Sequence, residues 1–179
     1  PGILSTMDKV TYSSDTTAAV PGAALSSARG SLAASSARSN GVPAFISDLN
    51  PAPSAPPVRF IDGSTGGGPN TGYFGGGSTP SVVSTMDKTS FASDTTEAVP
   101  GAALNEPRQY LSGTSNSDAG YFGAGYLKTT MEKTSFASDT TEAVPGAALN
   151  EPKDRMGATG NSTAGYFGGG YAQHPYDES

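Results

Sequence analysis

The sequence contains no cysteine, no tryptophan and a single histidine, His174. Without cysteine the chain has no disulfide framework, no thiolate metal site and no cysteine nucleophile. One histidine leaves almost nothing for a histidine-ligated metal or for Ser-His-Asp catalysis. We interpret His174 as a solvated residue of the C-terminal tail, and we predict a protein that is not an enzyme and has no cofactor.

Basic residues are few and long apolar stretches are missing. The 10 Lys and Arg residues are outnumbered by 16 Asp and Glu, which gives a net charge of −6 and a pI near 4.6. Nucleic-acid binding through phosphates needs clustered basic side chains, so no nucleic-acid partner is expected. No window approaches the roughly 18 apolar residues of a membrane-spanning helix. No signal peptide is visible, and because the chain starts at Pro1 we expect a processed or incomplete N-terminus.

Large apolar residues are scarce, whereas glycine and proline are abundant. Leu, Ile, Val and Phe make up 26 of 179 residues, while Gly contributes 24 and Pro 14. This composition is typical either of a loose chain or of a β-rich fold with many tight turns and a thin core. A compact helical enzyme is the outcome that the composition favours least.

The sequence consists of three copies of one unit. The segments Thr85–Pro107 and Thr130–Pro152 differ at one position of 23, where Asp87 corresponds to Glu132. A third copy lies at Thr6–Leu25, near the start of the chain. A motif GYFG(G/A)G closes each unit, at residues 72–77, 120–125 and 165–170. Units 2 and 3 are offset by 45 residues, whereas unit 1 carries about 34 extra residues. A fixed period of this length indicates a repeat architecture.

The repeats and one insertion divide the chain. We assign residues 1–77 to repeat 1, 78–125 to repeat 2, 126–170 to repeat 3 and 171–179 to a C-terminal tail. Repeat 1 contains a Pro-rich insertion at about 41–69, which suits an extended polyproline-like conformation. The insertion is either an arm that adds a strand to the sheet edge of a neighbouring subunit or a surface loop folded on its own repeat.

Each unit is expected to form four short β-strands. A Pro-Gly pair, a further proline and a Gly-rich end interrupt any helix, and the runs containing Thr, Tyr, Phe and Val suit strands. In repeat 2 we predict strands near 85–91, 97–99, 108–113 and 120–126. Four strands in about 45 residues is the period of a propeller blade. The prediction is therefore an all-β fold of three propeller-blade-like repeats.

The aromatic pair of the GYFG(G/A)G motif is predicted to supply much of each thin core. Its two rings point to opposite faces of a strand, and the flanking glycines let neighbouring strands pack closely. A flexible glycine linker is the alternative, but an aromatic pair that recurs three times argues against it. The residues predicted to form the repeat cores and assembly faces are Tyr73, Phe74, Tyr121, Phe122, Tyr166, Phe167, Met7, Met86, Met131, Tyr12, Phe91 and Phe136.

The run from MDK through SDTT to GYFGGG resembles the kelch-like β-propeller repeats of virion and tail-fibre proteins of tailed aquatic phages and their environmental relatives. The resemblance covers all three units and leaves out the insertion, and it includes the turn Thr159–Asn161 before the last motif. Its Asp-Thr pairs are Asp15-Thr16, Asp94-Thr95 and Asp139-Thr140. Asn105–Pro107 and Asn150–Pro152 depart from it, because they replace a Ser/Ala-Arg stretch that Ser26–Arg29 retains. The resemblance implies a β-propeller-like structural part with an extracellular or virion-surface location, and no enzymatic activity.

Three blades are too few to close a propeller ring, which needs at least about four. A repeat cannot bury its apolar side alone, and the free face of repeat 3 resembles the face that repeat 2 uses. We therefore expect head-to-tail self-assembly, either into a closed ring or into a filament. The alternative is that the chain is a piece of a longer propeller.

Other motifs carry little chemistry. The Asp-Thr pairs lack the spacing of a calcium loop and more simply close turns, and no Gly-rich motif continues into a phosphate-binding sequence. Asn161-Ser162-Thr163 matches an N-glycosylation acceptor. The tyrosines outside the repeat motif either stack on sugars or anchor subunit contacts; these are Tyr110, Tyr126, Tyr171 and Tyr176.

Two functions follow from the sequence. The first is a non-enzymatic structural subunit of an extracellular or virion-associated fibre or ring, with itself as the partner. The second is a propeller module that binds carbohydrate or a cell surface, as in host attachment. The two differ in where they put the repeated aromatic residues, since the first buries them in subunit contacts and the second exposes them in equivalent pockets.

Overall fold

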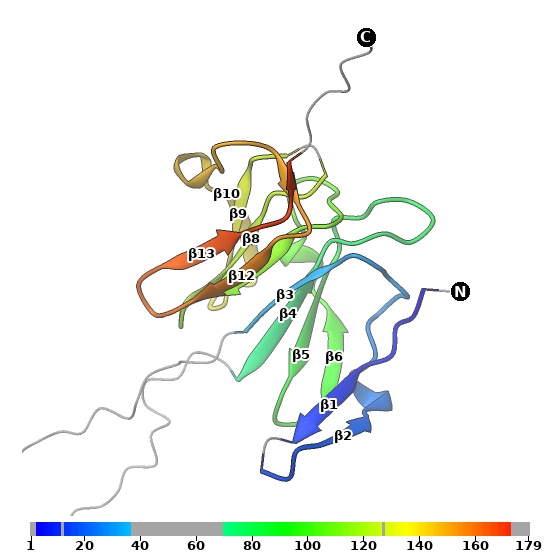
Figure 1. The fold of residues 1–179 in the computed structure, drawn as a ribbon. Helices are drawn as coiled ribbons and strands as arrows, with labels where there is room; N and C mark the ends of the chain where they lie inside the picture. Colours follow the sequence, from blue (N-terminus) through cyan, green and yellow to red (C-terminus); the bar gives the residue numbers. More distant parts are fainter. Residues whose placement is uncertain (1–2, 12, 37–69, 127, 173–179) are drawn as a thin grey trace, which may run out of the picture.

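The computed structural model describes residues 3–11, 13–36, 70–126 and 128–172, and it shows an all-β protein (Figure 1). This confirms the predicted fold class. Helical structure in the described ranges is limited to three one-turn 3-10 segments, η1 (Pro21–Ala23), η2 (Pro100–Ala102) and η3 (Pro145–Ala147). The strands are β1 (Asp8–Thr11), β2 (Thr16–Ala19), β3 (Ala33–Ser36), β4 (Thr71–Gly75), β5 (Met86–Ser90), β6 (Thr95–Ala98), β7 (Ser112–Ser115), β8 (Ala119–Gly123), β9 (Met131–Ser135), β10 (Thr140–Ala143), β11 (Lys153–Asp154), β12 (Gly157–Gly160), β13 (Gly165–Gly168) and β14 (Tyr171–Ala172).

Each repeat begins with the same hairpin and the same 3-10 turn. The hairpins β1–β2, β5–β6 and β9–β10 turn at an aspartate with a positive φ of 50–51°. Asp tolerates this left-handed conformation better than most side chains do. Each hairpin is followed by the Pro-Gly pair, whose proline begins the 3-10 segment because its φ is already fixed near the required value. The aspartates are Asp15, Asp94 and Asp139.

The sheets are out of phase with the sequence repeats. Two antiparallel four-stranded sheets have the orders β3-β4-β5-β6 and β7-β8-β9-β10. Each takes its first two strands from one repeat and its last two from the next. The expectation that the four strands of one repeat form one blade is therefore wrong, because the GYFG strand pairs with the first strand of the following repeat.

This offset leaves half of a sheet at each end of the chain. The first half-sheet is the hairpin β1–β2, and the second is the hairpin β12–β13; in the described residues each forms a two-stranded sheet. Figure 1 shows them on opposite sides of the molecule, β1–β2 in blue beyond β5 and β6, and β12–β13 in orange and red at the other end. The short pair β11 and β14 forms a further two-stranded sheet.

One of the strands predicted in repeat 2 is misplaced. The expected strand at 108–113 begins only at Ser112, because Tyr110 has a positive φ of 59° that interrupts an extended run. Its neighbour Leu111 turns into the core and is buried. The other three strands of this repeat lie within three residues of the predicted bounds, as β5, β6 and β8.

The core lies between the two four-stranded sheets. The rings of Tyr73 and Phe136 stack there with their centroids 5.0 Å apart. The buried cluster draws on all three repeats and consists of Ala33, Tyr73, Met86, Ala102, Leu104, Leu111, Phe122 and Phe136. The Pro-rich insertion falls between β3 and β4, where the other two repeats have a short turn, and it lies outside the described residues.

Candidate functional site

The most distinctive feature of the molecule is the contact between consecutive repeats, which occurs twice. We call the contact of repeat 1 with repeat 2 the first junction and that of repeat 2 with repeat 3 the second junction. In the first, β4 pairs with β5, with Tyr73 opposite Lys88. In the second, β8 pairs with β9, with Tyr121 opposite Lys133. The two registers are identical when the repeats are superimposed by sequence.

Each junction contains a buried ion pair. In the first, Arg29 pairs with Asp87, and neither side chain has any exposed area. In the second, Arg108 Nε lies 2.9 Å from Glu132 Oε1, and both side chains are at most 2% exposed. Each arginine also donates to backbone carbonyl oxygens next to β4 or β8, so every pair is held inside a hydrogen-bond network. Such pairs are strongly coupled to folding because loss of one partner leaves a buried charge.

The single difference between the two long repeat segments falls on this acid. Asp87 is one methylene shorter than Glu132, and it is reached by the terminal nitrogen of Arg29, so Arg29 Nε has no hydrogen-bond partner among the described residues. Asp87 accepts from the backbone N–H of Ser26, as Glu132 does from that of Asn105, and it also accepts from the hydroxyl of Ser26. In the second junction Glu106 compensates by accepting from Arg108 at 2.7 Å. The two junctions therefore satisfy the same charges with slightly different partners.

A second ion pair lies nearer the surface of each junction. Lys9 Nζ is 2.7 Å from Asp94 Oδ2, and Lys88 Nζ is 2.8 Å from Asp139 Oδ2. Tyr73 adds a hydrogen bond to the latter, with its hydroxyl 2.5 Å from Asp139 Oδ1. Burial, followed by this hydrogen bond, raises the pKa of Tyr73 to about 12. Burial opposes the charge of Asp139, but the bonds from Lys88 and Tyr73 prevail and hold the pKa of Asp139 below its ordinary value.

The Asp139 ion pair gives a testable dependence of stability on pH. Because the pKa of Asp139 is lower in the folded than in the unfolded chain, its contribution is complete above about pH 4 and is lost as the pH falls through the folded pKa. Asp139→Asn should lower the free energy of unfolding at neutral pH, and the gap to the unsubstituted protein should narrow on acidification. Urea unfolding at several pH values between neutral and acid measures this.

The matched control for that experiment is Asp118→Asn, since Asp118 is an exposed turn residue that accepts only from Ser117 among the described side chains. Its effect on unfolding should be small at every pH. A gap between Asp139→Asn and the unsubstituted protein that stays constant down to strongly acidic pH would contradict the ion-pair contribution.

Backbone hydrogen bonds also repeat across the junctions. Tyr110 N–H donates to Ser31 C=O at 2.9 Å, and Arg155 N–H donates to Tyr110 C=O at 2.9 Å. These three residues occupy the same place in successive repeats, and all have positive φ values of 52–59°. Each repeat thus receives one hydrogen bond from the next through the same irregular backbone.

Close approach between repeats depends on glycine in the aromatic motif. A Cβ atom on Gly165 would come 2.7 Å from Thr114 Cγ2 of the preceding repeat, which no ordinary contact allows. Gly120 approaches Ser35 in the same manner at the first junction. The glycines before the aromatic pair therefore let the inner strands of consecutive repeats touch, which is the role that the sequence predicted for them.

The aromatic and methionine residues singled out in the sequence do not share one environment. Tyr73, Phe122, Met86, Met131 and Phe136 are buried. Phe74, Tyr121, Phe167 and Met7 are half-buried. Phe91 is 39% exposed and Tyr166 is 64% exposed, and Tyr12 lies outside the described residues. Burial of the motif tyrosine falls steadily along the chain, from Tyr73 through Tyr121 to Tyr166.

This gradient follows from which face of a repeat is covered. The motif phenylalanine faces the preceding repeat, since a Cβ on Gly75 would lie 3.4 Å from Phe122 and one on Gly123 would lie 3.3 Å from Phe167. The motif tyrosine faces the next sheet, since Tyr73 of β4 stacks on Phe136, which directly follows β9 in the sheet β7-β8-β9-β10. Only the two-stranded sheet β12–β13 follows the sheet of Tyr121, which is half-buried, and in the described residues no sheet follows β12–β13, so Tyr166 remains exposed.

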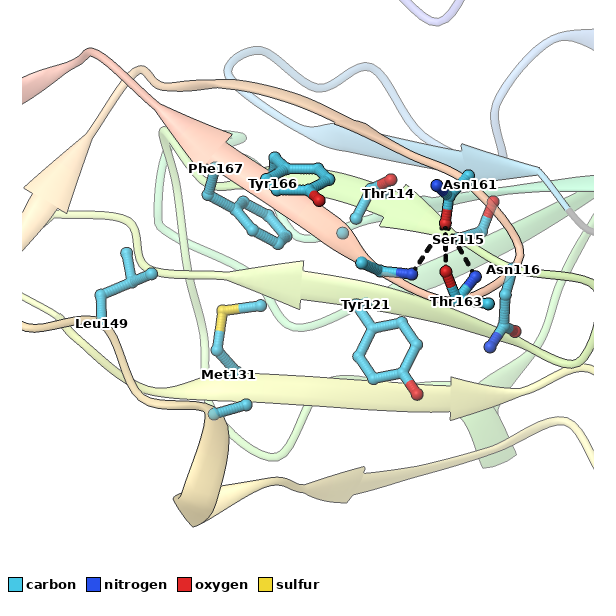
Figure 2. Close-up of a pocket in the computed structure, with 13 residues that line it drawn as sticks. Thr114, Ser115, Asn116, Tyr121, Met131, Leu149, Asn161, Thr163, Tyr166 and Phe167 are labelled. Carbon is cyan, nitrogen blue, oxygen red and sulfur yellow. Dashed lines mark hydrogen bonds between the residues drawn. The ribbon is translucent and has the colours of Figure 1, made fainter.

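A groove of about 470 Å³ lies beside this exposed tyrosine (Figure 2). Figure 2 shows Tyr166 and Phe167 of β13 on one side of it, with Met131, Leu149 and Tyr121 on the other. Ala147 lines it as well and is exposed, whereas Leu149 is half-buried. Their equivalents Ala102 and Leu104 are 0% and 3% exposed, because the second junction covers them.

A second groove, of about 730 Å³, lies at the opposite end of the repeat series. It is lined by Met7, Lys9 and Val10 of the first hairpin region and by Phe74 and Phe91. The two linings share equivalent residues of the repeat, since Met7 and Phe74 of the second groove correspond to Met131 and Phe167 of the first. The lining of the second groove includes two acids, Asp8 and Asp94, of which Asp94 pairs with Lys9. The described part of the chain has no cluster of three or more metal-ligating side chains.

The predicted glycosylation site lies in an exposed turn. Asn161 Oδ1 closes an exposed turn by accepting from Thr163 and Ala164 N–H, and the asparagine is accessible as a glycosylation acceptor would be. Arg155 lies over the rings of Tyr110 and Tyr171, at 4.2 and 5.6 Å from their centroids. His174 and Tyr176 fall outside the described residues.

Within the described ranges, no helix has the length and apolar character needed to cross a bilayer. The buried Arg–acid pairs are the functional residues that the sequence interpretation missed, although an acid recurs at the equivalent position of every repeat, as Asp8, Asp87 and Glu132.

No protein-family model matches the chain, and among curated proteins none matches significantly.

Proposed function

We propose that this protein is a non-enzymatic structural subunit that assembles head to tail through its repeat faces into a fibre or ring. One observation carries the proposal: the two internal junctions bury the same set of groups, while the two ends of the repeat series expose that set. Ala147 and Tyr166 are exposed at one end, and Asp8 is exposed at the other. A contact of this kind joins two different surfaces, so it repeats from copy to copy.

The distribution of the motif tyrosines supports assembly over sugar recognition. A carbohydrate-binding module would present Tyr73, Tyr121 and Tyr166 in equivalent open pockets. Tyr73 instead has no exposed area, and only Tyr166, the last of the three, is largely exposed. An aromatic residue whose exposure falls as more of the repeat series covers it is better suited to anchor an interface, where tyrosine is enriched. The likeness of the repeats to phage fibre proteins supports an extracellular or virion-surface setting.

The experiment is sedimentation velocity together with negative-stain electron microscopy over a dilution series of the purified chain. We expect the mean sedimentation coefficient to rise with concentration, with rings or filaments of one width in the micrographs. Particles of single-chain size at every concentration would overturn the proposal. A glycan array on the same sample would then test the carbohydrate-binding alternative.

A further inference from the structure

The edge of β13 differs from the corresponding edges in the rest of the molecule. The equivalent strands β4 and β8 each pair on both sides, with β3 and β5 or with β7 and β9. In the described residues β13 pairs only with β12, and β1 pairs only with β2. An unpaired strand edge is a template for pairing with another chain. The strands β5 and β9, which pair with β4 and β8, are the sequence equivalents of β1. The edge of β13 therefore lacks a strand that has the sequence pattern of β1.

Charge complementarity supports that match. Lys153 occupies the position of Arg29 and Arg108, and Asp8 occupies the position of Asp87 and Glu132. Asp8 is exposed, whereas both internal acids are at most 1% exposed. Thus one end of the repeat series carries the cation of a junction and the other carries its anion.

The outer ion pair of the junctions is divided between the ends in the same manner. Lys133 is the equivalent of Lys9 and Lys88, but among the described residues its ammonium pairs only with the exposed Glu142, at 3.2 Å. Asp15 is the equivalent of Asp94 and Asp139, and it is exposed. The β13 end of the repeat series therefore carries two cations, Lys133 and Lys153, and the β1 end carries the two corresponding anions, Asp8 and Asp15.

The end of β13 leaves open the place that a junction methionine fills at the internal junctions. At the first junction, Met86 is 1% exposed, and a Cβ on Gly75 would lie 2.9 Å from its Cε atom. Met7 is the equivalent methionine, and Gly168 is the equivalent glycine, with open space around it. Insertion of Met7 would bury apolar area on both partners, which favours association.

We propose that the β1–β2 hairpin of a second copy completes the β12–β13 half-sheet as an antiparallel four-stranded sheet. This inference rests on the proposed function and specifies the contact between two copies of the chain, which we call the joint. By the registers of the internal junctions, Tyr166 lies opposite Lys9 of the second copy, and Ala164 lies opposite Thr11. Lys153 then pairs with Asp8, and Lys133 pairs with Asp15. The occupant of the edge is a strand, as in other recognition by strand addition.

Disulfide cross-linking between separately prepared chains tests this register, because the chain has no cysteine of its own. Four single variants are made: Lys9→Cys, Thr11→Cys, Ala164→Cys and Tyr166→Cys. Mixing Lys9→Cys with Tyr166→Cys, or Thr11→Cys with Ala164→Cys, should give covalent dimers under mild oxidation. The two mismatched mixtures, Thr11→Cys with Tyr166→Cys and Lys9→Cys with Ala164→Cys, should react at least about tenfold more slowly, since a disulfide tolerates little extra Cα separation.

The internal control is one chain carrying Tyr121→Cys and Lys133→Cys, which occupy the same positions at the second junction. It should form an intrachain disulfide and show that the geometry permits one. Sedimentation of every variant before oxidation measures self-assembly by itself, so it distinguishes the proposed assembly from the proposed strand addition. Concentration-dependent assembly without faster cross-linking of the matched pairs would overturn the strand-addition joint but leave assembly intact. Cross-linking of Tyr166→Cys with itself would indicate a symmetric contact and overturn the joint, and absence of assembly would overturn both.

Discussion

Replacing Arg108 with alanine is expected to lower the free energy of unfolding by about 3–5 kcal/mol. The side chain of Arg108 is 2% exposed and pairs with that of Glu132, which is 1% exposed, so the substitution leaves a carboxylate buried without its counter-charge. It also removes the hydrogen bonds that Arg108 donates to the carbonyl oxygens of Ala124 and Thr130. Urea unfolding monitored by circular dichroism measures the change.

Two further variants make the result interpretable. Lys133→Ala removes a cation from the same sheet, but its partner Glu142 is 69% exposed, so the effect should stay within about 0.5 kcal/mol. Arg108→Lys keeps the charge but offers fewer donors, and repeat 3 carries lysine at this position, so its effect should be intermediate. A loss in Arg108→Ala no larger than that in Lys133→Ala would refute the structural role assigned to the buried pair.

Asp8→Lys is expected to weaken self-assembly at least about a hundredfold while leaving the chain folded. In the proposed joint, Asp8 meets Lys153 of a second copy, so the variant brings two cations together in a site from which water is removed. Asp8 is exposed within the chain, and its substitution should hardly affect unfolding. Sedimentation velocity over a dilution series reports the change in association.

Charge exchange is the decisive control for this prediction. Lys153→Glu alone should weaken assembly as Asp8→Lys does, and the double variant should recover it because each joint again pairs opposite charges. Glu97→Lys makes the same change in net charge at an exposed residue of β6, and it should leave assembly unchanged. If Glu97→Lys weakened assembly as much as Asp8→Lys, general charge rather than the joint would be responsible.

The sequence is sufficient to predict the repeats, the all-β class and most strands, because proline, glycine and strand-forming residues recur at a fixed period. It cannot predict where a sheet begins. A periodic sequence has no marked start, and the pairing of β4 with β5 rather than with a strand of its own repeat is decided by hydrogen bonds between segments. The strand predicted at 108–113 fails for a local reason, since the left-handed conformation of Tyr110 has no signature in its side chain.

The candidate site was only half visible in the sequence. The aromatic residues were identified because large apolar side chains usually signal a core. The buried ion pairs were missed because arginine and acids are usually exposed, and Arg29 and Asp87 are 58 positions apart. Comparison of equivalent positions across the three repeats could have found them, since a cation and an acid recur there in every copy.

The phase shift between repeat and sheet has a consequence for unfolding. Because each four-stranded sheet takes two strands from each of two repeats, repeat 2 cannot unfold alone without disrupting both sheets. In a nearest-neighbour description of repeat proteins, this places a large share of the free energy in the coupling between repeats rather than within them. Partly unfolded forms are then strongly disfavoured, so the array melts cooperatively even though each unit is small and has a thin core.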